Sequence, residues 1–150
     1  MRRNPLTTET APAAARRWLA RRDYSEAELQ ARLEREGLEA ADARALVAEL
    51  ADGWWQSDSR FAQMLVRQRL RQGKGPRLIA AELSTHQLSD ADIRLAFEEA
   101  EPDWAAAALE ALRRCRSSEP QKRQQFLLRK GFSGEQIRQA MRAVDSDAID

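Results

Sequence analysis

The tripeptide Gly37-Leu38-Glu39 decides the fold, because related tripeptides return twice further along the chain. They are Gly131-Phe132-Ser133 and, with glutamine in place of glycine, Gln87-Leu88-Ser89. The three copies are about 44 to 50 residues apart, a period typical of helical repeat proteins. The sequence therefore predicts three copies of one structural unit.

Apolar residues flank each tripeptide at the spacing of a single buried helix face. The stripes before the tripeptides contain Leu29 and Leu33, then Ile79 and Leu83, then Leu127, and those after them contain Ala43, Leu46, Val47 and Leu50, then Ile93, Ala96, Phe97 and Ala100, then Ile137, Ala140, Met141 and Val144. Alanine, leucine, glutamate, glutamine and arginine dominate the composition, whereas β-branched residues are few. We therefore expect an all-α protein with almost no sheet.

Capping residues mark where these helices begin and end. Serine-led capping boxes occur at Ser25-x-x-Glu28, Ser89-x-x-Asp92, Ser133-x-x-Gln136 and, with Pro120 in the first turn, Ser118-x-x-Gln121. Gly37, Gly73 and Gly131 stand where a left-handed residue would end a helix. The pattern predicts helices over 12–22, 25–36, 40–55, 58–72, 76–85, 89–100, 102–115, 119–130 and 133–144.

These nine helices form three repeats of three helices, at residues 12–57, 58–101 and 102–145. We expect flexible ends at residues 1–11 and 146–150. Three short helices bury little apolar surface alone, so neighbouring repeats should pack end to end into an elongated, curved tandem array. A single compact bundle is the alternative architecture.

The composition argues against several classes of function. Hydrophobic residues make up 43% and charged residues 33% of the 150 residues, which predicts a folded, soluble chain. No apolar stretch reaches the roughly 20 residues that cross a bilayer, and the N-terminus lacks the apolar core of a signal peptide, so we expect a cytoplasmic protein without membrane contact. One cysteine and one histidine leave no set of zinc ligands and no catalytic triad, so we expect no metal, no cofactor and no enzyme activity.

The net charge is only +1, but its distribution is uneven. Residues 59–81 contain Arg60, Arg67, Arg69, Arg71, Lys74 and Arg77 and no acidic residue. At 100° per residue, Arg60, Arg67 and Arg71 fall within roughly 40° of one another on one helix. Further basic blocks contain Arg16, Arg17, Arg21 and Arg22, and then Arg113, Arg114, Arg116, Lys122, Arg123, Arg129 and Lys130.

Clustered positive charge favours binding to phosphates or to an acidic protein surface. The residues that we expect to contact a partner protein or DNA are Arg60, Arg67, Arg71, Lys74, Arg77, Arg123, Arg129 and Lys130. The alternative for each of them is an ordinary solvated helix surface.

The tryptophans, the histidine and the cysteine are interpreted one by one. Trp54 and Trp55 could stack on a DNA base, but packing in the core or between repeats is favoured. Trp18 and Trp104 are expected in the core, His86 in a solvent-facing loop, and Cys115 as a partly buried thiol.

Three stretches resemble the RecX family of bacterial RecA regulators. They are Asp58-Ser59-Arg60-Phe61-Ala62, the run from Arg69 through Gly73-Lys74-Gly75-Pro76 to Leu83, and Phe126-Leu127-Leu128-Arg129-Lys130-Gly131-Phe132-Ser133. The resemblance covers about residues 14 to 144, and its middle motif is the most specific. The chain departs from the family where Ser57 replaces an acid, and where Gln87 and Glu39 replace the usual glycine and serine.

The resemblance implies a tandem helical repeat protein that lies in the helical groove of the RecA–DNA filament. There it would inhibit the ATPase, strand exchange and coprotease activities of RecA, restraining recombination and the SOS response. The implied partners are the RecA filament and single- or double-stranded DNA, with the chain acting as a monomer. The alternative function is a stand-alone nucleic-acid-binding protein that competes for DNA.

Overall fold

The structure, a computed structural model, describes residues 4–149, which form helices and connecting turns without any strand. The helices are α1 (Ala11–Arg21), α2 (Glu26–Arg35), α3 (Ala40–Asp52), α4 (Asp58–Arg71), α5 (Pro76–Thr85), α6 (Asp90–Ala100), α7 (Trp104–Arg113), α8 (Pro120–Arg129) and α9 (Gly134–Ile149). The predicted all-α class and the positions of the nine helices are confirmed.

Two helix ends differ from prediction by three residues or more. Helix α3 stops at Asp52, three residues early, because the chain turns at Gly53 and Trp54, where Trp54 has a φ of 65°. Helix α9 continues to Ile149, five residues further than predicted.

The predicted caps form at three of four places. Ser25 and Ser89 accept hydrogen bonds from the backbone N–H groups of Glu28 and Asp92, and Ser133 exchanges two hydrogen bonds with Gln136. The predicted cap at Ser118 is wrong, because Glu119 occupies the N-cap position of α8 and its side chain caps nothing. The glycines predicted to end helices, Gly37, Gly73 and Gly131, all have positive φ angles.

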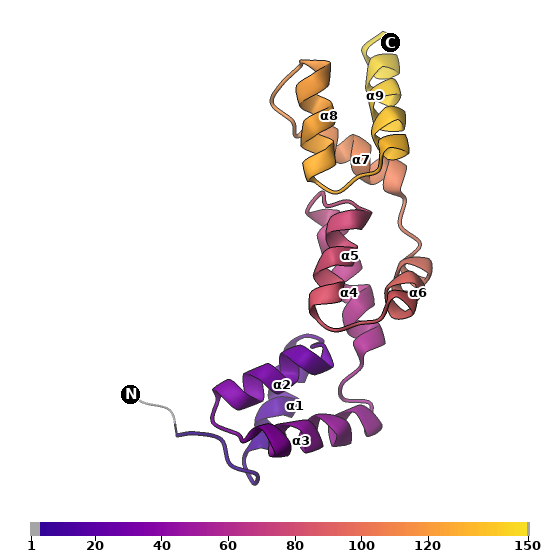
Figure 1. The fold of residues 1–150 in the computed structure, drawn as a ribbon. Helices are drawn as coiled ribbons and strands as arrows, with labels where there is room; N and C mark the ends of the chain where they lie inside the picture. The colour runs from indigo at the N-terminus through magenta and orange to yellow at the C-terminus, as the bar shows by residue number, and fades with distance from the viewer. Residues whose placement is uncertain (1–3, 150) are drawn as a thin grey trace.

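The helices form three groups, each around its own hydrophobic core. Repeat 1 is α1–α3, repeat 2 is α4–α6 and repeat 3 is α7–α9, and the helices pack chiefly within their own repeat. Fully buried residues at the centres of the three cores include Leu33, Phe61 and Phe132. The repeats follow one another along an elongated molecule, with the N-terminal repeat at one end and the C-terminal repeat at the other (Figure 1). The compact-bundle alternative is therefore wrong.

Side-chain hydrogen bonds join repeat 1 to repeat 2. The Asp58 carboxylate, at the start of α4, accepts from the backbone N–H of Glu26 at 2.7 Å and from the buried Gln56 amide at 2.9 Å. His86, at the end of α5, lies 2.8 Å from the Ser25 hydroxyl through Nδ1, and its ring lies 4.6 Å from that of Phe61. The predicted solvent-facing loop position of His86 is wrong, because the half-buried ring contacts the preceding repeat.

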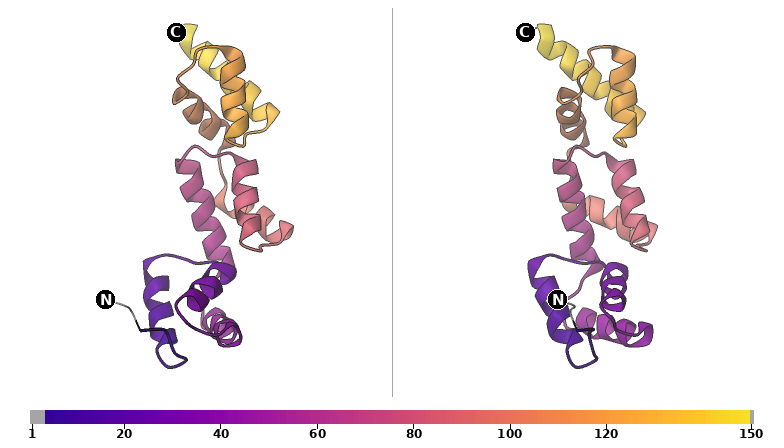
Figure 2. Two further views of the ribbon diagram at one scale, coloured as in Figure 1. Left: turned by 60° about the vertical axis from the view of Figure 1, so that its left-hand side comes forward. Right: turned by 90° about the vertical axis from the view of Figure 1, so that its left-hand side faces the viewer.

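Main-chain atoms join repeat 2 to repeat 3, where the turn between α8 and α9 meets the turn between α4 and α5 (Figures 1 and 2). Half-buried Trp104 also packs against the cores of both repeats and meets Phe97 edge to face at 5.5 Å. Trp104 and Trp18 therefore pack against the cores as partly buried rather than fully buried residues.

Candidate binding surface

Arg60 does not belong to a free basic stripe, because its side chain is bound at the junction between repeats 1 and 2. Its Nη2 donates to the carbonyl oxygens of Trp54 and Trp55 at 2.8 and 3.0 Å, and its Nε donates to the Asp23 carboxylate at 3.3 Å. These contacts tie α4 to the turn after α3 and to the turn between α1 and α2. The structure therefore gives Arg60 a structural role.

The glycine-rich turn after α4 forms the junction with repeat 3. The backbone N–H of Gly75 donates to the carbonyl of Lys130 at 2.6 Å, and that of Arg77 donates to the carbonyl of Gly131 at 3.0 Å. A Cβ atom on Gly75 would lie 2.6 Å from the main chain of Gly131 and Phe132. A side chain on Gly75 would therefore push the two turns apart.

This backbone contact gathers basic residues from two distant parts of the sequence. Lys74 precedes Gly75 in one turn, Arg77 follows in the first turn of α5, and Lys130 precedes Gly131 in the other turn. A groove of about 220 Å³ beside them is lined by Gln72, Gly73, Ala111, Arg114, Phe126 and Lys130. We name Arg71, Lys74, Arg77, Arg114, Arg129 and Lys130 the junction surface.

The other basic residues have different surroundings. Arg67 is exposed on α4 and donates a long hydrogen bond of 3.4 Å to Gln63, whose amide in turn donates to Glu99 on α6. Arg69 is half-buried and pairs with the Glu82 carboxylate at 2.8 Å. Arg123 is half-buried, and its Nε donates to the carbonyl of Ser117 at 3.0 Å. Arg69 and Arg123 therefore brace the fold.

The junction surface is strongly positive because its segments contain almost no acid. Residues 59–81 and 120–134 contain no Asp or Glu. The carboxylate that follows, Glu82, is already paired with Arg69. Arg71, Arg77 and Arg129 are exposed and have no ion pair with any residue that the structure describes. Their charge is available to an anionic partner.

Arg114 was not predicted from the sequence to contact a partner. It belongs to the second basic block but stands at the C-cap of α7, in a segment without the resemblance motifs. A placed Cβ on Gly73 would lie 3.5 Å from the guanidinium of Arg114, which shows how close α7 comes to the turn after α4. The only sequence signal for Arg114 was the positive charge of the basic block to which it belongs.

The predicted packing of Trp54 is wrong, because its side chain is 79% exposed, and Trp55 is 48% exposed. Had α3 continued, Trp54 would have followed Leu50 by four residues on the buried face of the helix. The early end of α3 at Asp52 places Trp54 in the turn instead. Cys115 is partly buried, as predicted.

The part of the chain that the structure describes holds no group of three or more histidine, cysteine or acidic residues placed to bind a metal ion. Among the same residues, no helix has both the length and the apolar character needed to cross a membrane. The fold and the junction surface together define a tandem helical repeat protein with a basic surface where two repeats meet.

Comparisons with known proteins place the chain within this class. The family model for the second three-helix domain of RecX matches residues 57–96, and that for the third three-helix domain matches residues 101–141. The regulatory protein RecX of Chromohalobacter salexigens is 44% identical over 131 residues, covering 83% of this chain and 86% of the relative. That of Stenotrophomonas maltophilia is 42% identical over 137 residues, covering 86% of this chain and 83% of the relative. The chain belongs to the RecX family of regulatory proteins.

Solved structures share the fold. The crystal structure of RecX from Lactobacillus salivarius superposes with a TM-score of 0.71 at 21% identity, covering 92% of this chain and 96% of that chain. A second crystal structure of regulatory protein RecX gives a TM-score of 0.66 at 23% identity, covering 91% of this chain and 78% of that chain.

Proposed function

We propose that this chain is a non-enzymatic regulator that binds the RecA–DNA filament and inhibits the ATPase, strand exchange and coprotease activities of RecA. In this role it restrains recombination and the SOS response, acting as a cytoplasmic monomer. Membership of the RecX family supports the general role. The observation that carries the proposal is the backbone contact between Gly75 and Lys130, which gathers the junction surface.

The shape and the charge of the molecule suit a filament groove. Three repeats in an elongated row can follow a groove over a longer distance than a compact bundle of the same size (Figure 2). The junction surface can contact DNA phosphates and acidic protein patches together, since clustered positive charge provides affinity for both. The main-chain junction holds the basic groups at a set spacing, which lowers the entropic cost of binding.

The test is the rate of DNA-dependent ATP hydrolysis by RecA on preformed filaments, measured as the chain is added at fixed DNA excess. Inhibition well before the free DNA is saturated supports direct action on the filament. The double variant Arg71→Glu with Arg77→Glu should weaken that inhibition. Its matched control is Arg44→Glu with Arg94→Glu, two exposed arginines outside the junction surface with no ion pair to a described residue. Equal loss in both double variants would overturn the assignment of the surface.

The alternative function is a stand-alone nucleic-acid-binding protein that competes with RecA for DNA. The exposed basic residues support it as well. It predicts inhibition only after the free DNA is covered, and binding to bare DNA that weakens steeply with salt. Variants that keep DNA binding but lose inhibition would exclude this alternative.

A further inference from the structure

Repeat 1 contains a pocket of about 400 Å³ that is separate from the junction surface. It lies between α1, α2 and the segment before α1, which is held in place by a 2.8 Å hydrogen bond from the backbone N–H of Leu6 to the carbonyl of Glu36. The residues lining it are Asn4, Leu6, Ala14, Arg17, Trp18, Arg21, Arg32 and Glu36. Its volume falls in the range of small-molecule binding sites, about 300 to 1,000 Å³.

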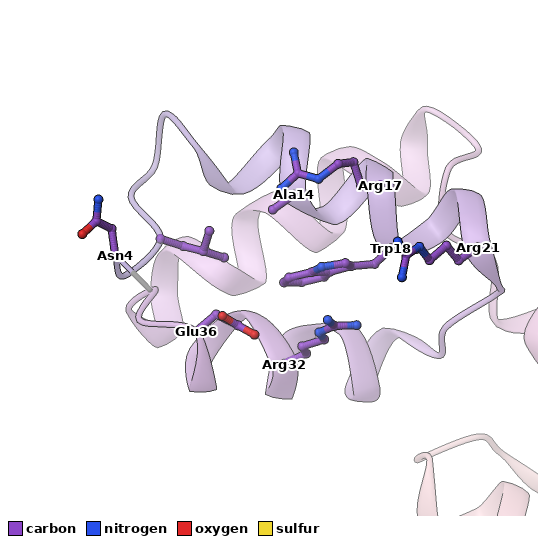
Figure 3. A pocket seen from close by; sticks show the side chains of 8 residues that line it. Asn4, Ala14, Arg17, Trp18, Arg21, Arg32 and Glu36 are labelled. Atoms are coloured by element: carbon purple, nitrogen blue, oxygen red, sulfur yellow. The ribbon is translucent and has the colours of Figure 1, made fainter. Parts of the chain in front are cut away.

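A flat aromatic ring stands in the middle of this pocket. The half-buried indole of Trp18 extends from α1 into the space between α1 and α2, with Arg32 on its α2 side (Figure 3). The guanidinium carbon of Arg32 lies 3.9 Å from the ring centroid, and Nη1 of Arg32 donates to the Tyr24 hydroxyl. The hydrogen bond to Tyr24 fixes the Arg32 side chain, and the Arg32 guanidinium in turn packs against the Trp18 ring. Trp18 is therefore ordered before any ligand arrives.

The pocket lining is positively charged. It carries the guanidinium groups of Arg17, Arg21 and Arg32 and a single carboxylate, Glu36. Arg17 and Arg21 are exposed and have neither an ion pair nor a hydrogen bond with any residue in the described range 4–149. The chain folds without using them, and both extend from α1 at the pocket (Figure 3).

The neighbouring Arg22 behaves differently. Two hydrogen bonds of 3.0 Å tie it to the Glu28 carboxylate, and they raise the pKa of its guanidinium. Its guanidinium also lies 3.7 Å from the centroid of the Tyr24 ring. Arg22, at the C-cap of α1, is therefore used by the fold, whereas Arg17 and Arg21 within α1 are left for a ligand.

We propose that this pocket binds a nucleoside phosphate, with the phosphate at Arg17 and Arg21 and the base stacked on Trp18. A guanidinium group can donate two parallel hydrogen bonds to the oxygens of one phosphate, and an indole ring can stack on any base. A peptide of acidic residues alone would use the arginines but has no ring to stack on Trp18. The ligand is a free nucleotide or one nucleotide of a single DNA strand, and the proposal depends on neither RecA nor the junction surface.

The test follows the indole N–H signal of Trp18 by NMR in the full-length chain, with the signal assigned from a Trp18→Phe variant. The probes are deoxyadenosine monophosphate, inorganic phosphate, a short single strand of deoxyadenylate and a hexaglutamate peptide. The pocket variant is Arg17→Gln with Arg21→Gln. The matched control is Arg35→Gln with Arg44→Gln, which removes the same charge from exposed arginines of repeat 1 outside the pocket.

The nucleotide or the strand should shift the Trp18 signal. The affinity obtained from that titration should be about tenfold weaker in the pocket variant, because two charge-assisted contacts are lost. The control variant should bind within about twofold of the wild type. A shift by the strand alone identifies single-stranded DNA as the source, whereas comparable binding of the mononucleotide identifies a free nucleotide.

Three results would overturn the proposal. The first is no shift of the Trp18 signal by either nucleotide probe at millimolar concentration. The second is equal affinity in the pocket and control variants. The third is binding of inorganic phosphate or hexaglutamate as tightly as the nucleotide, because the base would then contribute nothing.

Discussion

Both junctions hold neighbouring repeats together, but one uses side-chain atoms and the other uses main-chain atoms. Repeats 1 and 2 are joined by side chains, chiefly those of Asp58, Gln56 and Arg60. Repeats 2 and 3 are joined by main-chain hydrogen bonds at Gly75 and Gly131. Side-chain contacts engage polar side chains in the junction, whereas main-chain contacts leave the neighbouring side chains free to bind other groups. This difference explains why Arg60 is tied to the fold while Arg71 and Arg77 make no ion pair with any residue that the structure describes.

The largest effect is expected from Gly75→Ala. The added Cβ would lie 2.6 Å from the main chain of repeat 3, so the junction must open at a cost of about 2 to 3 kcal/mol. Urea unfolding followed by circular dichroism measures this loss. The control is Gly134→Ala in the first turn of α9, where the new Cβ meets only the end of the Arg138 side chain and should stabilise the helix by about 0.5 to 1 kcal/mol. Equal stability of the two variants would contradict the main-chain junction.

The next effect is expected from Asp58→Ala, which breaks the side-chain junction. The Glu26 N–H loses its acceptor, and the Gln56 amide, in a residue that is 4% exposed, keeps only the Tyr24 carbonyl, at a cost of about 1.5 to 3 kcal/mol in unfolding free energy. Asp90→Ala is the matched control, because Asp90 also follows a capping serine but is exposed at the start of α6. It should cost about 0.5 kcal/mol, from the helix dipole alone.

A smaller effect separates the two arginines at the ends of α4. Arg60→Gln should lower stability by about 1 kcal/mol or less, because water screens its ion pair, and should leave inhibition of RecA unchanged. Arg71→Gln should leave stability unchanged and weaken inhibition. Thermal melts and the ATPase titration measure the two properties side by side. The opposite pattern would mean that the side-chain junction, not the main-chain one, presents the binding residues.

The smallest effect is expected at two left-handed turn residues beside the side-chain junction. Trp54 and Gln87 both have a φ of 65°, a conformation that glycine adopts more easily. Trp54→Gly and Gln87→Gly should each raise stability by about 0.5 to 1 kcal/mol in thermal unfolding. Trp55→Gly is the control, because Trp55 has no positive φ to relieve, and it should not stabilise.

Local signals predicted the helices well. Ser25 and Ser89 cap where their boxes indicated, and Gly37 and Gly131 end helices with positive φ. The prediction failed at Trp54, because the turn after α3 has a tryptophan in the left-handed conformation, which glycine adopts after α2 and α8. A turn formed by an unfavourable residue has no local signature.

The candidate site was predicted in part. The acid-free block around Gly73 and Gly75 was visible in the sequence, but its contact with the turn at Gly131 was not. His86 was misplaced for the same reason, since its partner Ser25 is 61 residues away. The pocket around Trp18 also depends on tertiary contacts, because Arg32 comes from the next helix.

The sequence by itself determined nine helices in three repeats and a strongly basic middle, because caps, glycines and apolar periodicity act within one or two helical turns. Only the tertiary structure decided which arginines are free to bind. Arg60 pairs with Asp23, which is 37 residues away, and Gly75 donates a hydrogen bond to Lys130 in the next repeat. Such pairings depend on how whole repeats dock, and no local pattern encodes that geometry.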